Sequence, residues 1–179
     1  MTKIKFFFVL ICGFLLIACE SKSATHAKMT GEKLATLIQK FDEDAKIEGN
    51  SVQFELNDRD IYLVYDAAAD RMRIISPIAP AAMADEDILQ RMMQANYDAV
   101  LDSRYALGNN IIWSVFIHPL SSLTKEDFLS GIAQTVTAVE TFGTSYTSGA
   151  MVFGGGDSNA IHEDLLKQLE DATDAGKEI

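Results

Sequence analysis

The sequence predicts an α+β domain with one antiparallel sheet of about five strands, in the order α-β-β-β-α-β-β-α, followed by a C-terminal helix. Two blocks of the chain alternate apolar and polar residues, as half-buried strands do. Four other segments repeat their apolar residues at helical spacing. Short turns separate the strands within each block, and strands joined by short turns pair antiparallel.

The first half of this domain opens with a helix over about 31–47, for which Thr30 is the predicted N-cap and Gly49-Asn50 the stop. Three strands follow, separated by the turns "NDRD" and "DAAADR". Their alternating apolar residues are Val52, Phe54 and Leu56, then Ile61, Leu63 and Tyr65, then Met72 to Ile75. We expect Pro77 and Pro80 to end the third strand and to open a crossing loop.

The second half begins with a helix from Asp85 to Ser103. Its predicted buried stripe consists of Ile88, Leu89, Met92, Ala95 or Asn96, and Val100. A hairpin follows, in which Gly108-Asn109 supplies the left-handed conformations of a tight turn. The next helix starts after Thr124, with Asp127 in a near capping box, and runs to about 142. The last helix, capped by Ser158, has an apolar stripe made of Ile161, Leu165, Leu166 and Leu169.

This order of elements, with the size and acidity of the chain, resembles the type III secretion chaperones of the Tir-chaperone-like class and the related sensory-transduction regulators. The segments that carry the resemblance are "DIYLVYD", "LQRMMQANYDAV", "YALGNNIIWSVF" and "LTKEDF", within about 31–142. None of them contains a catalytic motif. The resemblance implies a small domain that dimerises and holds another polypeptide in an extended form.

The N-terminus is typical of an exported lipoprotein. Lys3 and Lys5 precede an unbroken apolar run from Phe6 to Ala18, which is shorter than the roughly 20 residues of a membrane span and fits an export signal. The run ends in "LIAC", which resembles the lipobox of bacterial lipoproteins. That resemblance implies cleavage before Cys19 and attachment of lipid, including palmitate, to its thiol. The alternative is an ordinary signal or a helical anchor with an unmodified cysteine.

These features predict where the protein resides and how it is organised. Glu20, in place of an aspartate, does not indicate retention in the inner membrane, so we expect an outer-membrane lipoprotein facing the periplasm. The predicted organisation is a signal peptide at 1–18, a tether at 19–30, the chaperone-like domain at 31–142, a flexible linker at 143–159 and a helix at 160–173.

Charge and cysteine content exclude several partners and crosslinks. The chain has a net charge of −11, and loss of Lys3 and Lys5 with the signal takes it to −13. Nucleic acid and anionic lipid would both repel such a surface. Cys12 leaves with the signal and Cys19 is acylated, so we expect no disulfide within the mature chain.

The strands predict an interaction surface. Both "IYLVY" and "IIWSVF" are apolar on two faces, whereas the helices can cover only one face of the sheet. A large exposed apolar patch is unusual on a monomer, so we expect a homodimer, or the C-terminal helix, to cover the other face. The candidate partner-binding residues are Tyr62, Val64, Ile112 and Phe116.

Trp113 alternates with Ile111 and Val115, which predicts a core residue; on an open face it would instead be an aromatic anchor for a partner. A peptide client would add as a strand to an edge of the sheet. The stretch 143–160, with its apolar island at 150–153, is open to three interpretations: a linker, a mobile flap, or an intramolecular strand that occupies that edge itself.

An envelope hydrolase that uses His118 and acidic residues is one alternative function, and a small-ligand sensor is another. His118 can serve as a base for Ser121 or Ser122, although a histidine hydrogen-bonded at a strand end explains it better. The histidines lack metal-ligand spacing, and "GGGD" lacks the lysine of a phosphate-binding loop.

Two acidic pairs are candidates for weak calcium ligands. Asp42/Asp44 and Asp85/Asp87 both lie outside any EF-hand pattern, and a helix N-terminus explains the second pair better. The sequence therefore predicts a non-catalytic binding protein without cofactor or metal, which self-associates and holds an extended polypeptide.

Overall fold

The computed structural model describes residues 28–145, 151–152 and 158–175. The predicted signal peptide, Cys19, most of the tether and most of the linker lie outside these residues. The predicted α+β class is confirmed, and the antiparallel sheet has six strands in the order β1-β2-β3-β4-β6-β5. A separate two-stranded pair joins β7 (Thr144–Ser145) to β8 (Met151–Val152).

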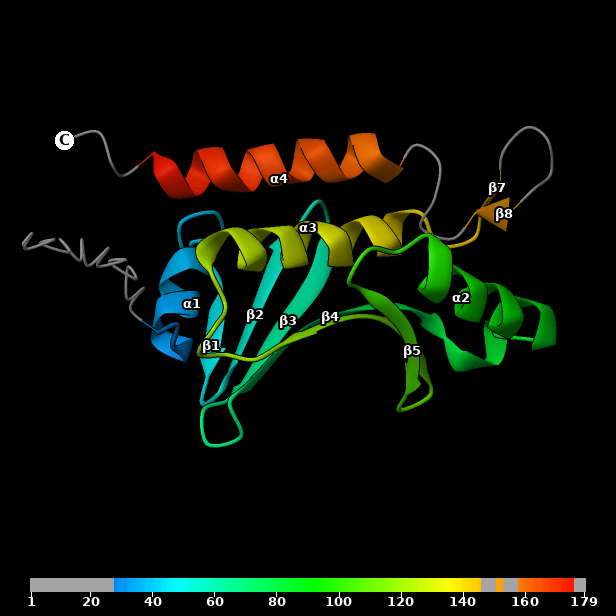
Figure 1. The fold of residues 1–179 in the computed structure, drawn as a ribbon, viewed down its shortest axis with the longest axis horizontal. Coiled ribbons are helices and arrows are strands. Elements are labelled where there is room, and N and C mark those ends of the chain that lie inside the picture. Colours follow the sequence, from blue (N-terminus) through cyan, green and yellow to red (C-terminus); the bar gives the residue numbers. More distant parts are fainter. Residues whose placement is uncertain (1–27, 146–150, 153–157, 176–179) are drawn as a thin grey trace, which may run out of the picture.

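The elements alternate along the chain much as the sequence predicts (Figure 1). The strands of the main sheet are β1 (Lys46–Glu48), β2 (Ser51–Leu56), β3 (Arg59–Asp66), β4 (Arg71–Pro80), β5 (Arg104–Gly108) and β6 (Ile111–His118). The helices are α1 (Gly31–Ile38), α2 (Glu86–Asp98), α3 (Lys125–Glu140) and α4 (Ser158–Asp174), with a short 3-10 turn, η1 (Ala81–Met83), before α2.

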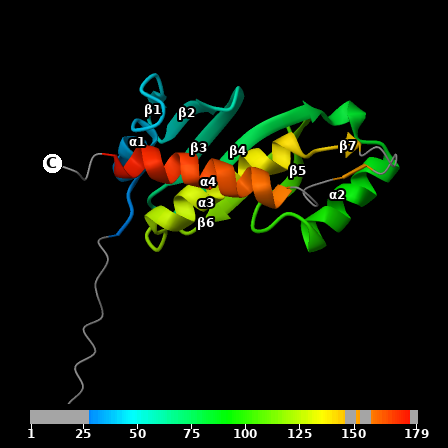
Figure 2. The same cartoon turned by 90° about the horizontal axis from the view of Figure 1, so that it is seen from above.

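The described helices all lie on one side of the sheet. Helix α3 packs on β4 and β6, and α4 packs on the outer side of α3, so the layers run sheet, α3, α4 (Figures 1 and 2). Residues 131–139 are all buried, because α3 is enclosed between the sheet and α4. Helix α1 flanks the β1 end of this layer and α2 flanks β5 at the opposite end.

The main core fills the space between the sheet and these helices. Its members include Leu34 and Ile38 of α1, Phe128 of α3, and Leu165 and Leu169 of α4. A smaller cluster joins α2 to the β5 end of the sheet through Met92, Ala95, Val100, Tyr105, Ile112 and Ala138. The predicted inward residues of β2 and β3 belong to the main core, as their alternation implies.

Helix α2, predicted to run from Asp85 to Ser103, ends at Asp98, because the amides of Asp102 and Ser103 donate to the Gln134 side chain of α3. Three further differences from the sequence prediction follow, and the first is the end of α1. The helix begins after Thr30, whose hydroxyl accepts from the Lys33 amide, but it ends at Ile38 instead of about 47. Both oxygens of Asp42 accept backbone amides, from Asp44 at 3.0 Å and Glu55 at 2.8 Å, which turns the chain toward the sheet. Residues 46–48 consequently form β1, and Gly49, at φ 59°, makes the hairpin to β2.

The second difference is that β4 continues through both prolines to Pro80. Pairing with β3 stops at Ile75, so beyond that point β4 has β6 on one side only. A strand with one free side tolerates residues that lack an amide hydrogen. The register shifts between Pro77 and Ala79 at the same place.

The third difference concerns the hairpin between β5 and β6. Asn109 and Asn110, at φ 51° and 60°, take the left-handed conformations that were assigned to Gly108-Asn109. Asparagine tolerates this region better than other residues with a Cβ. The predicted capping box of α3 is confirmed. The Asp127 backbone amide donates to the Thr124 hydroxyl, and the Thr124 backbone amide donates to the Asp127 carboxylate.

Helix α4 contains a half-buried histidine, His162. The Nδ1 atom of His162 is buried and has no hydrogen-bond partner among the described residues. Burial lowers the pKa of His162, and the neighbouring Glu163 acts in the opposite direction. The folded state therefore favours the neutral imidazole.

This burial predicts a pH dependence of stability. Because the pKa of His162 is lower in the folded than in the unfolded chain, its contribution is fully present above about pH 6.5 and is lost as the pH falls through that value. We expect calorimetry to show a lower melting temperature at pH 5.5 than at pH 7.5. In His162→Leu the melting temperature should depend less steeply on pH. His118→Gln, which removes the other described histidine, is the control. An unchanged slope in His162→Leu would contradict the prediction.

Candidate functional site

The side of the sheet opposite the helices is the candidate site. Strand register places a set of apolar residues on this side, which we call the open face: Tyr62, Val64, Ile75, Pro77, Trp113, Val115 and Ile117. All are half-buried except Ile117, which is 54% exposed. No described helix lies over them (Figure 1). A continuous apolar surface of this kind marks an interaction site more often than a free surface.

The four predicted partner-binding residues do not share a face. Tyr62 and Val64 lie on the open face, whereas Ile112 and Phe116 are 0% and 4% exposed on the helix-covered face. Placing Ile112 and Phe116 at a surface is therefore wrong. Phe116 packs against Gly131 of α3, where a Cβ atom would approach its ring to 2.7 Å, so glycine is needed for this close contact.

Trp113 is a half-buried residue of the open face and not a core residue. Its indole Nε1 donates to the Gly108 carbonyl at 2.9 Å, which holds the ring against the β5–β6 hairpin. Pro77 of β4 is the cross-strand neighbour of Trp113. The structure thus places the tryptophan on the open face, as in the alternative to a core position.

The C-terminal helix does not cover the open face. Leu165 and Leu169 of α4 pack into the main core from the α3 side, and the Lys40 ammonium donates to the Thr173 carbonyl near the end of α4. The helix is therefore fixed on the side away from the open face (Figure 2). That alternative is wrong, because the apolar stripe of α4 is already used against α3.

A second exposed apolar surface lies on α2. Leu89, Met93 and Tyr97 recur at every fourth residue and form what we call the α2 ridge, and the exposed Leu101 follows three residues after the helix ends at Asp98. Met93 and Tyr97 are 69% and 91% exposed, and Leu89, predicted as buried, is exposed as well. The four-residue spacing was visible in the sequence, but a helix at the end of a sheet buries a narrower stripe than one packed on its centre.

Both edges of the sheet are poor acceptors for an added strand. The Asn96 side chain accepts from the Tyr105 amide at 2.7 Å and donates to the Tyr105 carbonyl at 3.0 Å, so it occupies the outer edge of β5. The other edge strand, β1, has three residues, all exposed, and two of them are charged. Short, charged or covered edges oppose strand addition. The open face is consequently a better site for a polypeptide than either edge.

The residues of the predicted hydrolase do not assemble. The His118 Nδ1 lies 2.8 Å from the Pro119 carbonyl oxygen, as expected for a histidine bonded at a strand end. Ser121 instead donates its amide and hydroxyl to the Asp70 carboxylate, at 2.7 and 2.8 Å. These two bonds lower the pKa of Asp70. A hollow of about 320 Å³ does contain His118, but its two acids, Asp102 and Asp127, are exposed.

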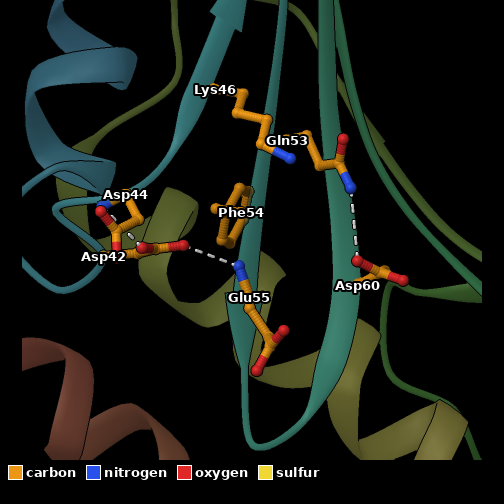
Figure 3. Close-up of a pocket in the computed structure, with 7 residues that line it drawn as sticks. All are labelled: Asp42, Asp44, Lys46, Gln53, Phe54, Glu55 and Asp60. Carbon is orange, nitrogen blue, oxygen red and sulfur yellow. Dashed lines mark hydrogen bonds between the residues drawn. The ribbon is translucent and has the colours of Figure 1, made fainter.

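An acidic hollow of about 300 Å³ lies where β1, β2 and β3 meet the chain after α1 (Figure 3). Asp42 uses both carboxylate oxygens on backbone amides, and Asp60 accepts from the Gln53 amide at 3.3 Å. Asp85 of the other predicted pair caps α2 by accepting from the Ile88 amide. These carboxylates thus stabilise turns and helix ends.

The described residues also lack two further features. Within them, no group of three or more His, Cys, Asp or Glu side chains is arranged to hold a metal ion. In the same part of the chain, no helix combines the length and the apolar character that crossing a bilayer requires.

Comparison with known proteins identifies the fold. No family model matches the sequence, and comparison with curated proteins finds no significant match. One chain of the crystal structure of the ExsC–ExsE complex matches with a TM-score of 0.50 and 13% identity, covering 63% of this chain and 92% of that one. A chain of the HopA1–SchA chaperone–effector complex matches at 0.47 and 13%, covering 60% and 90%. The chain has the type III secretion chaperone-like fold that its sequence predicts.

Proposed function

We propose that this protein is a non-catalytic binding protein that holds an extended polypeptide on its open face. The observation that carries the proposal is the apolar sheet surface with no described helix over it. An extended chain is a suitable occupant, because its alternating side chains match the two-residue repeat of the exposed strands. The chaperone–effector complex among the structural matches is in keeping with this activity.

We also propose that the chain self-associates through the α2 ridge. Residues four apart form a ridge that packs into the grooves of a second, identical helix. In an antiparallel pair, the acidic first turn of α2, with Glu86, would face the end of the partner helix. Arg104 lies at that end, where its guanidinium donates to the Val100 and Leu101 carbonyls. In this two-fold arrangement Glu86 of each copy would lie near Arg104 of the other, so opposite charges would pair at both ends of the apolar ridge.

The proposed location rests on the N-terminal sequence. Acylation of Cys19 would attach the chain to the periplasmic face of the outer membrane, with eight residues, 20–27, between Cys19 and Lys28. Incorporation of labelled palmitate into the parent chain, and its loss in Cys19→Ser, would test the anchor.

The binding proposal is tested on the chain from Glu20 onward with blocked synthetic peptides in which serine alternates with leucine, isoleucine or valine. Trp113 is the single tryptophan, so its emission reports directly on the open face. We expect a blue shift that saturates with peptide and is absent with a polyserine peptide. The absence of any shift, together with no binding by calorimetry, would contradict the proposal.

A further inference from the structure

The open face contains one feature that its apolar character does not explain. Arg73 of β4 is exposed and stands between Val64 of β3 and Ile117 of β6, its direct cross-strand neighbours. Ile75 follows it on the same face. The guanidinium of Arg73 thus lies within an otherwise apolar patch. A ligand that covers the patch must therefore also bury this positive charge.

Arg73 has no ion-pair partner among the described residues. The closest acid on the face by register is Asp66, which stands opposite Arg71. Its carboxylate accepts the amides of Ala68 and Ala69 at 2.9 Å, so it stabilises its own turn. The guanidinium of Arg73 is therefore available to a ligand.

The remaining acids on this side lie on strands β1 to β3. Glu48, Glu55 and Asp60 occupy the open side of these strands by register, and Lys46 lies among them. In contrast, β4 presents Arg71 and Arg73 on that side, and none of β4, β5 and β6 has an acid there. Strands lie about 4.8 Å apart, so Glu48 on β1 is roughly 14 Å from Arg73 on β4, beyond the Debye length of about 8 Å. The surface around Arg73 is therefore positively charged, although the whole chain is acidic.

We propose that the open face selects an extended polypeptide segment that carries a carboxylate next to alternating apolar residues. The carboxylate pairs with Arg73, and the apolar residues at two-residue spacing cover Ile75 with Val115 and then Pro77 with Trp113. A guanidinium binds a carboxylate with two parallel hydrogen bonds, and covering the patch removes the water that would screen this pair. This inference rests on the proposed function and adds the chemistry of the ligand.

The test compares three alternating peptides that differ at one residue, which is glutamate, glutamine or lysine, placed two residues before the first apolar position. We expect the glutamate peptide to bind the parent chain about 10-fold more tightly than the lysine peptide. Arg73→Glu should reverse this order, and Arg73→Gln should abolish the difference. Arg91→Glu, an exposed arginine on α2, is the matched control and should leave the order unchanged.

Each other outcome overturns the inference. It also shows whether only the charge preference fails or whether the proposed function fails as well. Equal affinity for the three peptides would leave binding at the open face intact and remove the charge preference. Tighter binding of the lysine peptide would mean that the acidic residues on β1 to β3, and not Arg73, determine the charge preference of the open face. If Arg73→Glu changes the molar mass in solution and no peptide binds, a second copy of the chain occupies the face. No binding and no change in mass would overturn the proposed function as well.

Discussion

The double variant Met93→Glu/Tyr97→Glu is expected to be monomeric under conditions in which the parent chain is a dimer. In an antiparallel two-fold pair the middle of the ridge lies at the axis, so Met93 and Tyr97 of one copy meet Met93 and Tyr97 of the other and the variant brings four carboxylates into one small apolar contact. Like charges in an interface cost several kcal/mol, and we expect self-association to weaken at least about 100-fold, or about 3 kcal/mol. Light scattering behind size-exclusion chromatography, over a series of protein concentrations, measures the change.

The control for this prediction is Arg91→Glu, which adds negative charge to the same helix on another side. Both ridge residues are exposed in the monomer, so the double variant should keep its free energy of unfolding within about 0.5 kcal/mol per site. A folded double variant that self-associates as tightly as the parent would exclude the α2 ridge as the contact. A parent chain that remains monomeric at every concentration would exclude self-association itself.

Trp113→Ala is expected to weaken the binding of the alternating peptides about 30-fold, or about 2 kcal/mol. Tryptophans at the centre of an interface contribute more than their neighbours, because they cover a large area and lose little conformational freedom. Trp113 lies between Pro77 of β4 and Ala106 of β5, so its removal leaves a hollow in the open face. Since this variant also removes the fluorescent residue, binding is measured by the anisotropy of a labelled peptide.

A second variant separates lost binding from lost folding. Ile117→Asp changes an exposed residue of the same face, next to Arg73, and we expect a loss of affinity of at least about 10-fold with little change in melting temperature. Ile47→Asp is the matched control, because Ile47 is also an exposed isoleucine but its side chain is on the other side of the sheet. Equal losses in both aspartate variants would mean that the open face is not the binding site.

The periodicity of the chain predicts most of the fold because each buried strand alternates and each helix has one apolar stripe. The capping box at Thr124 and the inward residues of β2 and β3 follow from local chemistry, which is why they are confirmed. The end of α1 does not follow in this way. It depends on the Asp42 carboxylate meeting the Glu55 amide, a contact between segments that become neighbours only after the sheet forms.

The candidate site was predictable in part. Two-faced apolar strands indicate that some surface of the sheet needs a partner, and Tyr62 and Val64 are on it. Alternation divides β6 into two sets of residues but does not say which set faces the helices. The sequence prediction assigned Ile112 and Phe116 to the exposed set, whereas Trp113 and Ile117 are the residues on the open face. Either set of an alternating strand can face the core, because a shift of one residue exchanges the two faces.

By itself, the sequence determined the order of the main helices and strands, the acidity and the lipobox-like N-terminus, because these depend on residues close together in the chain. Only the tertiary structure decided that α4 packs on α3, that Asn96 closes the edge of β5, and that Arg73 lies among apolar neighbours. Each of these is a contact between separate elements of the fold. Their physical origin is the packing of the described helices on one side of the sheet, which leaves the opposite face with no described helix over it.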